Sequence, residues 1–195
     1  MTAYGMARAA AVLALCLGLA WFGLNTGSNP VEPGERDSSD STYLDANTLF
    51  EDAQYDRAAE LYAKALAQKA DHLPALRGLA NAHLQLRRLG PALAAIDRAV
   101  ALEPDFGGNY AIRGIIHDHM GAHPKAIADY EKALALDPGL ADGMSWLDRL
   151  LHNVQQRPAT VADRLAYLKV QLSLPEDKRV LRRPELDDKQ RPYER

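Results

Sequence analysis

The chain has 195 residues, of which 26 are acidic and 23 basic, for a formal net charge of −3. A chain of this length usually forms one domain, and its mildly acidic balance argues against nucleic acid as a partner, because nucleic-acid-binding domains usually carry a basic patch. The single cysteine, Cys16, lies in the N-terminal apolar stretch. An intrachain disulfide is therefore excluded, and so is a thiolate site in the folded part.

The N-terminus, residues 1–24, has the pattern of a membrane-targeting segment. The 16 residues that follow Arg8 carry no charge, and as a helix they would span about 24 Å, somewhat less than a bilayer core of roughly 30 Å. Arg8 predicts that the N-terminus stays inside and that the rest of the chain is translocated. The segment is either a cleaved signal peptide or an uncleaved inner-membrane anchor. Trp21 near its outer end and the lack of a clear cleavage motif favour the anchor.

Residues 25–38 are polar and acidic and contain proline and glycine, which is typical of a flexible tether. This tether disfavours the alternative that residues 1–24 are a buried helix of a soluble protein. Lipidation of Cys16 is also disfavoured, because Leu15 precedes it where a small residue is needed. We therefore expect a bacterial-type cell-envelope protein whose folded part lies in the periplasm.

Residues 39–140 consist of three units of 34 residues, 39–72, 73–106 and 107–140, which align without gaps. Small residues recur at matching positions: Ala46, Ala80 and Gly114; Ala58, Ala92 and Ala126; Ala65, Ala99 and Ala133. A large residue recurs beside them, at Tyr62, Ile96 and Tyr130. In a helix these spacings form one stripe. Each unit is therefore expected to be two antiparallel helices that approach closely where the small residues meet.

Pro104 and Pro138 end the second and third units, where they would stop a helix. Together with the 34-residue period, this pattern resembles the tetratricopeptide repeat family, whose unit is a helix–turn–helix. The resemblance implies an all-α fold, a right-handed solenoid of stacked helix pairs.

Residues 141–173 are expected to form a degenerate fourth helix pair that caps the stack. The second helix of this pair has Pro158 at a favourable first-turn position. A terminal unit must cover the last apolar surface and present a polar outer side. Arg164, Lys169 and Gln171 suit that outer side.

The resemblance also implies a binding surface on the concave side of the solenoid, lined by the first helix of each unit. The candidate peptide-binding residues at the lining positions are Tyr43, Asn47, Arg77, Asn81, Leu84 and Ile115. An asparagine amide offers both a donor and an acceptor, so it can hold the backbone of an extended peptide, and Arg77 could meet a carboxylate. The alternative is that these residues are solvated or pack within the fold.

One subgroup of the family binds the C-terminal carboxylates of chaperones through a clamp of lysine, asparagine and arginine residues. Asn47 matches one clamp position. However, Tyr43 stands where a lysine is expected, and Gly108 and Ile112 stand where basic residues are needed. These departures disfavour the chaperone clamp.

No catalytic motif accompanies the repeats, so we expect a protein that is not an enzyme and needs no cofactor or metal. The segment HDHMGAH places His117, His119 and His123 close together, and histidines four apart on one helix can share a metal ion. His123, however, precedes Pro124 at the expected start of a new helix, and no His-Glu-x-x-His motif is present. A histidine-based metal or enzymatic role is the alternative from a different functional class.

Residues 174–195 form a tail in which 13 of 22 residues are charged, and such a segment cannot form its own core. It nevertheless contains Val180, Leu181, Leu186 and Tyr193. We interpret it as a docking arm, either onto the repeats of the same chain or onto a partner, with plain disorder as the alternative.

A stack of helix pairs offers an extended surface and no reaction chemistry. The expected function is that of a scaffold that binds an extended segment or C-terminal tail of a partner protein during assembly of an envelope complex. Self-assembly through the open end of the stack is the alternative among interaction proteins.

Overall fold

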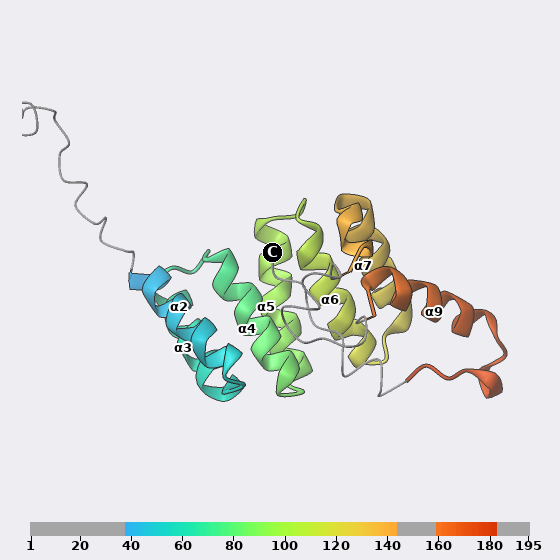
Figure 1. The fold of residues 1–195 in the computed structure, drawn as a ribbon, viewed down its shortest axis with the longest axis horizontal. Coiled ribbons are helices and arrows are strands. Elements are labelled where there is room, and N and C mark those ends of the chain that lie inside the picture. The colour runs from blue at the N-terminus through green and yellow to red at the C-terminus, as the bar shows by residue number, and fades with distance from the viewer. Residues whose placement is uncertain (1–37, 144–158, 183–195) are drawn as a thin grey trace, which may run out of the picture. The chain divides into compact units, whose positions relative to one another are not determined.

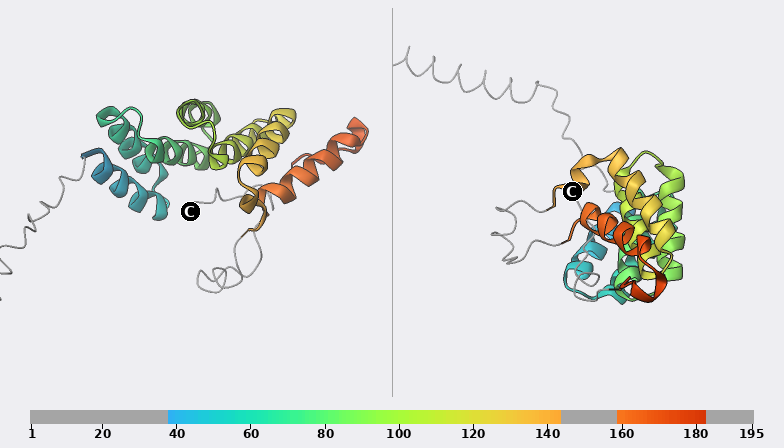
Figure 2. Two further views of the ribbon diagram at one scale, coloured as in Figure 1. Left: turned by 90° about the horizontal axis from the view of Figure 1, so that it is seen from above. Right: turned by 90° about the vertical axis from the view of Figure 1, so that its right-hand side faces the viewer.

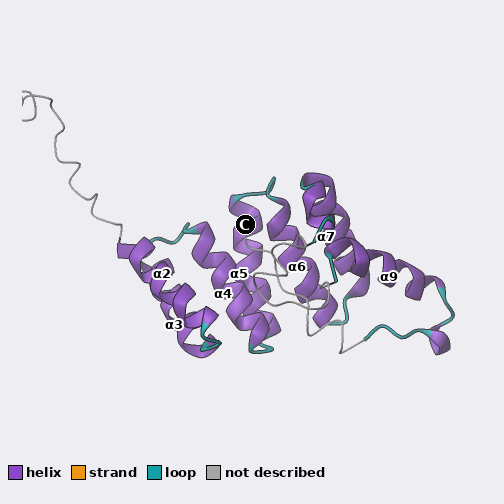
Figure 3. Ribbon diagram, viewed as in Figure 1, coloured by secondary structure: helices purple, strands orange, loops and turns teal. Residues whose placement is uncertain are grey.

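The computed structural model describes residues 38–143 and 159–182. These residues form helices joined by short loops, with no strand among them (Figure 3). The targeting segment 1–24 lies outside the described residues, as do nearly all of the tether and most of the expected first capping helix. Within the described ranges, no helix is both long and apolar enough to cross a membrane.

Three helix–turn–helix pairs follow one another along the chain (Figure 1). They are α2 (Ser38–Glu51) with α3 (Tyr55–Gln68), α4 (Leu73–Gln85) with α5 (Leu89–Leu102), and α6 (Gly107–His119) with α7 (His123–Leu136). The two helices of a pair pack on each other, and the second helix of each pair packs on the first helix of the next. The all-α stack of helix pairs predicted from the sequence is confirmed.

The turn inside each pair has the same geometry at every 34-residue step. Ala53, Arg87 and Gly121 have φ values of 57°, 57° and 75°, in the left-handed region that favours glycine. The residue after each of them donates its N–H to a carbonyl near the end of the first helix: Gln54 to Leu49, Arg88 to His83 and Ala122 to His117. This hydrogen-bond pattern ends a helix with one left-handed residue, and only Gly121 adopts it without the steric cost of a Cβ atom.

Small residues lie where the helices of a pair cross, as the sequence predicts. The alanines at these crossings are fully buried: Ala46, Ala58, Ala80, Ala92 and Ala126. Gly114 completes the series, because a Cβ atom placed on it would lie 2.6 Å from the Tyr130 ring. The large residues beside the crossings, Tyr62, Ile96 and Tyr130, are also buried, and they fill the space that the small residues leave.

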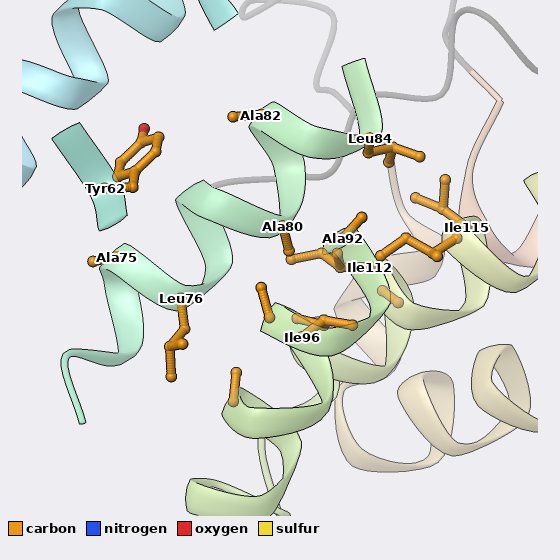
Figure 4. Packing of buried hydrophobic residues seen from close by; sticks show 14 of the residues in the cluster. Tyr62, Ala75, Leu76, Ala80, Ala82, Leu84, Ala92, Ile96, Ile112 and Ile115 are labelled. Atoms are coloured by element: carbon orange, nitrogen blue, oxygen red, sulfur yellow. The ribbon is translucent and has the colours of Figure 1, made fainter. Parts of the chain in front are cut away.

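Tyr62 also connects the first pair to the second. A Cβ atom placed on Gly78 of α4 would lie 2.4 Å from Cε1 of the Tyr62 ring. The tyrosine therefore occupies space that exists only because residue 78 has no side chain. Figure 4 shows Tyr62 beside α4 at one end of the apolar core.

The C-terminal part of the described chain starts with a short 3-10 helix, η1 (Pro138–Ala141), and continues with α9 (Val161–Ser173) and a second 3-10 helix, η2 (Glu176–Lys178). Helix α9, orange in Figures 1 and 2, packs on α7 and η1. Thr160 caps it, because its hydroxyl accepts from the Asp163 N–H at 3.1 Å and the Asp163 carboxylate accepts from the Thr160 N–H at 2.9 Å. This reciprocal cap starts the helix at Val161, later than the expected start near Pro158.

Arg164 does not lie on the outer side of α9, so that expectation is wrong. Its side chain is 3% exposed, and its guanidinium donates two hydrogen bonds to Asp118, from Nε at 2.6 Å and from Nη2 at 3.0 Å. Burial of an arginine requires such a paired carboxylate. Lys169 is on the outer side as expected, half exposed and paired with Glu131.

Candidate peptide-binding site

The first helices of neighbouring pairs contact one another, α2 with α4 and α4 with α6. Their side chains at helical spacing therefore form one continuous surface, which we call the first-helix face. The six predicted binding residues lie on these three helices and define it: Tyr43 and Asn47 on α2, Arg77, Asn81 and Leu84 on α4, and Ile115 on α6.

Asn81 is the most unusual polar residue of this face. Its side chain is 1% exposed, and its Oδ1 atom is buried without a hydrogen-bond donor among the described residues. A buried acceptor without a partner costs about 1–3 kcal/mol. A hydrogen-bond donor from another segment that reached Asn81 Oδ1 would remove this cost.

Only one of the two polar groups of the Asn47 side chain is hydrogen-bonded within the fold. Its Oδ1 accepts a hydrogen bond of 2.6 Å from the Tyr62 hydroxyl, which fixes the orientation of the amide. Its Nδ2 group has no hydrogen-bond partner among the described residues. The two asparagines therefore present opposite functions, a donor at Asn47 and an acceptor at Asn81.

Tyr43 takes part in a contact between the first two pairs. Its ring lies 6.0 Å from the Tyr62 ring and 5.1 Å from the His72 ring, both in tilted arrangements. His72 accepts from the Ala75 N–H at Nδ1 and therefore donates from Nε2 to Asp40, at 2.9 Å. Tyr43 is thus partly packed within the fold, and only the remainder of its ring is available to a ligand.

Leu84 and Ile115 form the apolar part of the face. They are 5% and 4% exposed, and Figure 4 shows their side chains pointing toward each other from α4 and α6. Both belong to the buried core cluster, so this part of the face packs within the fold.

Arg77 already has an acidic partner. Its Nη1 atom lies 2.8 Å from Glu103 Oε2 and 3.4 Å from Asn109 Oδ1, and its guanidinium carbon lies 4.7 Å from the Phe106 ring centroid. A ligand carboxylate would have to compete with Glu103 for this arginine. This pair was not identified from the sequence, because Arg77 and Glu103 lie 26 residues apart and no motif connects them.

Asp118 is a further polar residue that the sequence analysis did not select. It occupies the position of α6 that corresponds to Phe50 and Leu84 in the earlier units. Besides Arg164 it accepts a hydrogen bond of 3.0 Å from His123 Nδ1. The signal in the sequence was a carboxylate at a position that is apolar in the other two units.

The histidines of the HDHMGAH segment have separate partners. His117 donates to Asp129 at 2.8 Å, His119 accepts from Arg87 at 2.7 Å, and His123 donates to Asp118. Among the residues that the structure describes, no group of three histidine, cysteine or acidic side chains could hold a metal ion. The described residues thus give no geometric support to the histidine-based alternative.

Two side chains near these helices have perturbed acidity. The pKa of His83 is lowered, chiefly by burial and secondly by Arg88, whereas Asp56 acts in the opposite direction. The pKa of Arg113 is raised, chiefly by its hydrogen bonds to Asp129. Neither group belongs to the first-helix face, so both perturbations concern the fold.

Comparison with known proteins identifies the repeat. Residues 49–111 and 108–140 match two family models of the tetratricopeptide repeat. Among curated proteins, the Hsp70-Hsp90 organizing protein of Triticum aestivum is 30% identical over 110 residues, which is 55% of this chain and 19% of that protein. The chain therefore spans only about a fifth of the length of the curated relatives it matches.

Several solved structures have the same fold. The first TPR of Spaghetti (RPAP3) bound to the HSP90 peptide SRMEEVD has a TM-score of 0.58 at 19% identity, over 74% of this chain and 99% of that one. The second TPR domain of human RPAP3 in complex with the HSP70 peptide SGPTIEEVD has a TM-score of 0.50 at 26% identity, over 52% and 84%. MamA has a TM-score of 0.52 at 25% identity, over 58% and 66%. Taken with the 34-residue period and the buried small residues at the helix crossings, these matches show that the repeat region belongs to the tetratricopeptide repeat family.

Proposed function

We propose that the chain is a non-catalytic adaptor that holds an extended peptide segment of a partner protein on its first-helix face. The observation that carries the proposal is the buried Oδ1 atom of Asn81, which accepts no hydrogen bond from the described residues. A backbone N–H of an extended peptide would satisfy it, for a net gain of about 0.5–1.5 kcal/mol. The Nδ2 group of Asn47 would donate to a carbonyl of the same peptide.

The half-buried ring of Tyr43 would supply side-chain contact. It would meet one apolar side chain of the bound segment, whereas Leu84 and Ile115 are buried in the core. Burial of one such side chain contributes about 1.5–3 kcal/mol. Backbone hydrogen bonds at the asparagines and one apolar contact at Tyr43 together favour a segment in extended conformation.

Relatives support a peptide as the ligand class, since two of the similar structures are of TPR domains with bound chaperone peptides. The present face differs from a carboxylate clamp in charge. Arg77 is neutralised by Glu103, and Tyr43, Gly108 and Ile112 carry no charge. We therefore favour an internal extended segment over a terminal carboxylate as the group recognised.

The cell envelope is the proposed location. The support is the uncharged run after Arg8, which would anchor the chain or direct its export. The partner is then a component of an envelope complex during its assembly. A reporter enzyme that is active only outside the cytoplasm, fused after Arg195, should be active, and an inactive but intact fusion would contradict the location.

The test of peptide binding is a quantitative pull-down with the Asn47→Ala/Asn81→Ala double variant. We expect at least a tenfold loss of the captured partner, because two backbone-directed amides are removed. The matched control is Gln68→Ala/Gln85→Ala, which removes two exposed amides at the ends of α3 and α4. Equal capture by both double variants would show that the face does not bind the partner.

A further inference from the structure

We infer that residues 183–195 of the same chain occupy the first-helix face and that a partner segment must displace them. This inference rests on the proposed function, because it assigns a regulator to the same surface. The segment itself lies outside the described residues.

The described chain turns back along α9 after that helix ends. Arg179 donates from Nε to the Leu174 carbonyl at 2.9 Å, and the Val180 N–H donates to Gln171 Oε1 at 2.8 Å. Tyr167 lies one helical turn before Gln171 on α9, and its hydroxyl donates to the Val180 carbonyl. These bonds direct residues 179–181 toward the N-terminal end of α9.

This return path ends beside the first-helix face. Arg164 Nη2 donates to the Leu181 carbonyl at 2.9 Å, and the same guanidinium pairs with Asp118 of α6. Leu181 itself packs against the core cluster. Residue 181 is therefore only one side chain away from Asp118, which continues the face beyond Ile115 on α6.

The remaining segment is long enough to cross the face. Residues 183–195 would span about 40 Å if extended, whereas three neighbouring helices at about 9 Å spacing require only about 20 Å. Pro184 and Pro192 oppose helix formation in this segment and favour extended backbone. Leu186 and Tyr193, seven residues apart, would then lie roughly 23 Å from each other, enough for the first to meet α6 and the second α2.

The tail would contact the more open residues of the face. Asn81, Leu84 and Ile115 are only 1%, 5% and 4% exposed, whereas Tyr43, Asn47 and Arg77 are half-buried. A tethered segment faces an effective concentration on the order of 1 mM. Even a weak contact with an intrinsic Kd of about 10–100 μM would then be occupied most of the time.

The first experiment measures self-competition in the 195-residue chain. The probe is a fluorescein-labelled synthetic peptide of residues 183–195. We expect the Leu186→Ser/Tyr193→Ser chain to bind this probe roughly 10- to 100-fold more tightly than the unchanged chain, because its own tail no longer competes. The matched control is Lys189→Ser/Gln190→Ser, which should bind like the unchanged chain. Equal affinity of all three chains would overturn the inference.

The second experiment locates the tail with a photo-crosslinking residue in place of Tyr193 in the 195-residue chain. We expect crosslinks within one chain to peptides of α2, α4 or α6. Crosslinks between two chains, to another surface only, or none at all would overturn the inference. If the tail fails to reach the face but Asn47→Ala/Asn81→Ala still abolishes partner capture, the inference fails and the proposed function stands. If the tail lies on the face but the asparagine variants capture the partner normally, the proposed function fails instead.

Discussion

Single residues decide the geometry of the turns and the acidity of the buried groups. Ala53, Arg87 and Gly121 occupy one backbone conformation at three equivalent turns, but only the third residue suits it. The pKa of His83 is lowered, since both burial and Arg88 oppose its protonated form. Both features produce stability effects that involve no ligand.

Ala53→Gly should stabilise the chain by about 0.5–1 kcal/mol, because glycine adopts a left-handed φ without the Cβ clash. Gly121→Ala is the mirror control and should destabilise by about 1 kcal/mol, although nothing lies within 4 Å of its added Cβ. Urea denaturation of both variants checks this. A loss of stability for Ala53→Gly would mean that the turn is not held in the left-handed region.

The lowered pKa of His83 predicts acid-sensitive stability. The unfolded state, with a histidine pKa near 6.5, takes up the proton first as the pH falls. The stabilising effect of the neutral imidazole is therefore complete above about pH 6.5 and decreases as the pH falls toward the folded-state pKa. His83→Gln should flatten the fall in melting temperature between pH 7 and pH 5, and an unchanged slope would assign the acid sensitivity to other groups.

At the scale of the helices, packing between pairs depends on complementary sizes. Tyr62 is buried, and its hydroxyl donates a hydrogen bond to Asn47 in the same helix pair. Its ring occupies the space beside Gly78 in the next pair. The contact therefore joins α2, α3 and α4. It also fixes the asparagine that faces the proposed ligand.

Gly78→Ala should destabilise the chain by about 1–3 kcal/mol through overpacking against Tyr62, despite the better helix propensity of alanine. The control is Gly90→Ala in α5, where nothing lies within 4 Å of the added Cβ and no loss of stability is expected. Thermal denaturation distinguishes the two variants. Equal melting temperatures would contradict the tight contact at Gly78.

At the scale of the whole described chain, one buried ion pair connects the cap to the repeats. Arg164 of α9 meets Asp118 of α6 across 46 residues of sequence. Lys169 of the same helix forms an exposed pair with Glu131 of α7. The two ion pairs link α9 to the repeats but differ in burial. Their removal should therefore lower the free energy of unfolding by different amounts.

Arg164→Leu should lower the free energy of unfolding by about 3–5 kcal/mol, because it leaves the Asp118 carboxylate buried without the guanidinium that pairs with it. Lys169→Leu should cost less than about 1 kcal/mol, since exposed pairs contribute little. Hydrogen exchange of the α9 amides gives the direct readout, with faster exchange expected only for the first variant. Unchanged protection of α9 in Arg164→Leu would show that apolar contacts alone hold this helix.

The repeat could be read from the sequence because its determinants are local and periodic. The small residues at Ala58, Ala92 and Ala126 recur at a fixed spacing, and each marks a helix crossing. The pairings of Arg77 with Glu103 and of Arg164 with Asp118 could not be read in this way, because contacts between distant charges leave no periodic signal. The period placed the six site residues on one face. Their hydrogen-bonding states, above all that of Asn81, depend on tertiary contacts that leave no pattern in the sequence.

The fit between Tyr62 and Gly78 also restricts the order of the units. The equivalent residues one step later are Ile96 and Ile112, both buried, so the second junction pairs two residues of medium size. If the first unit were placed directly before the third, Tyr62 would face an isoleucine in the space where it now meets no side chain. The three units are therefore not interchangeable modules, and duplication or shuffling of one unit would require a compensating change in its neighbour.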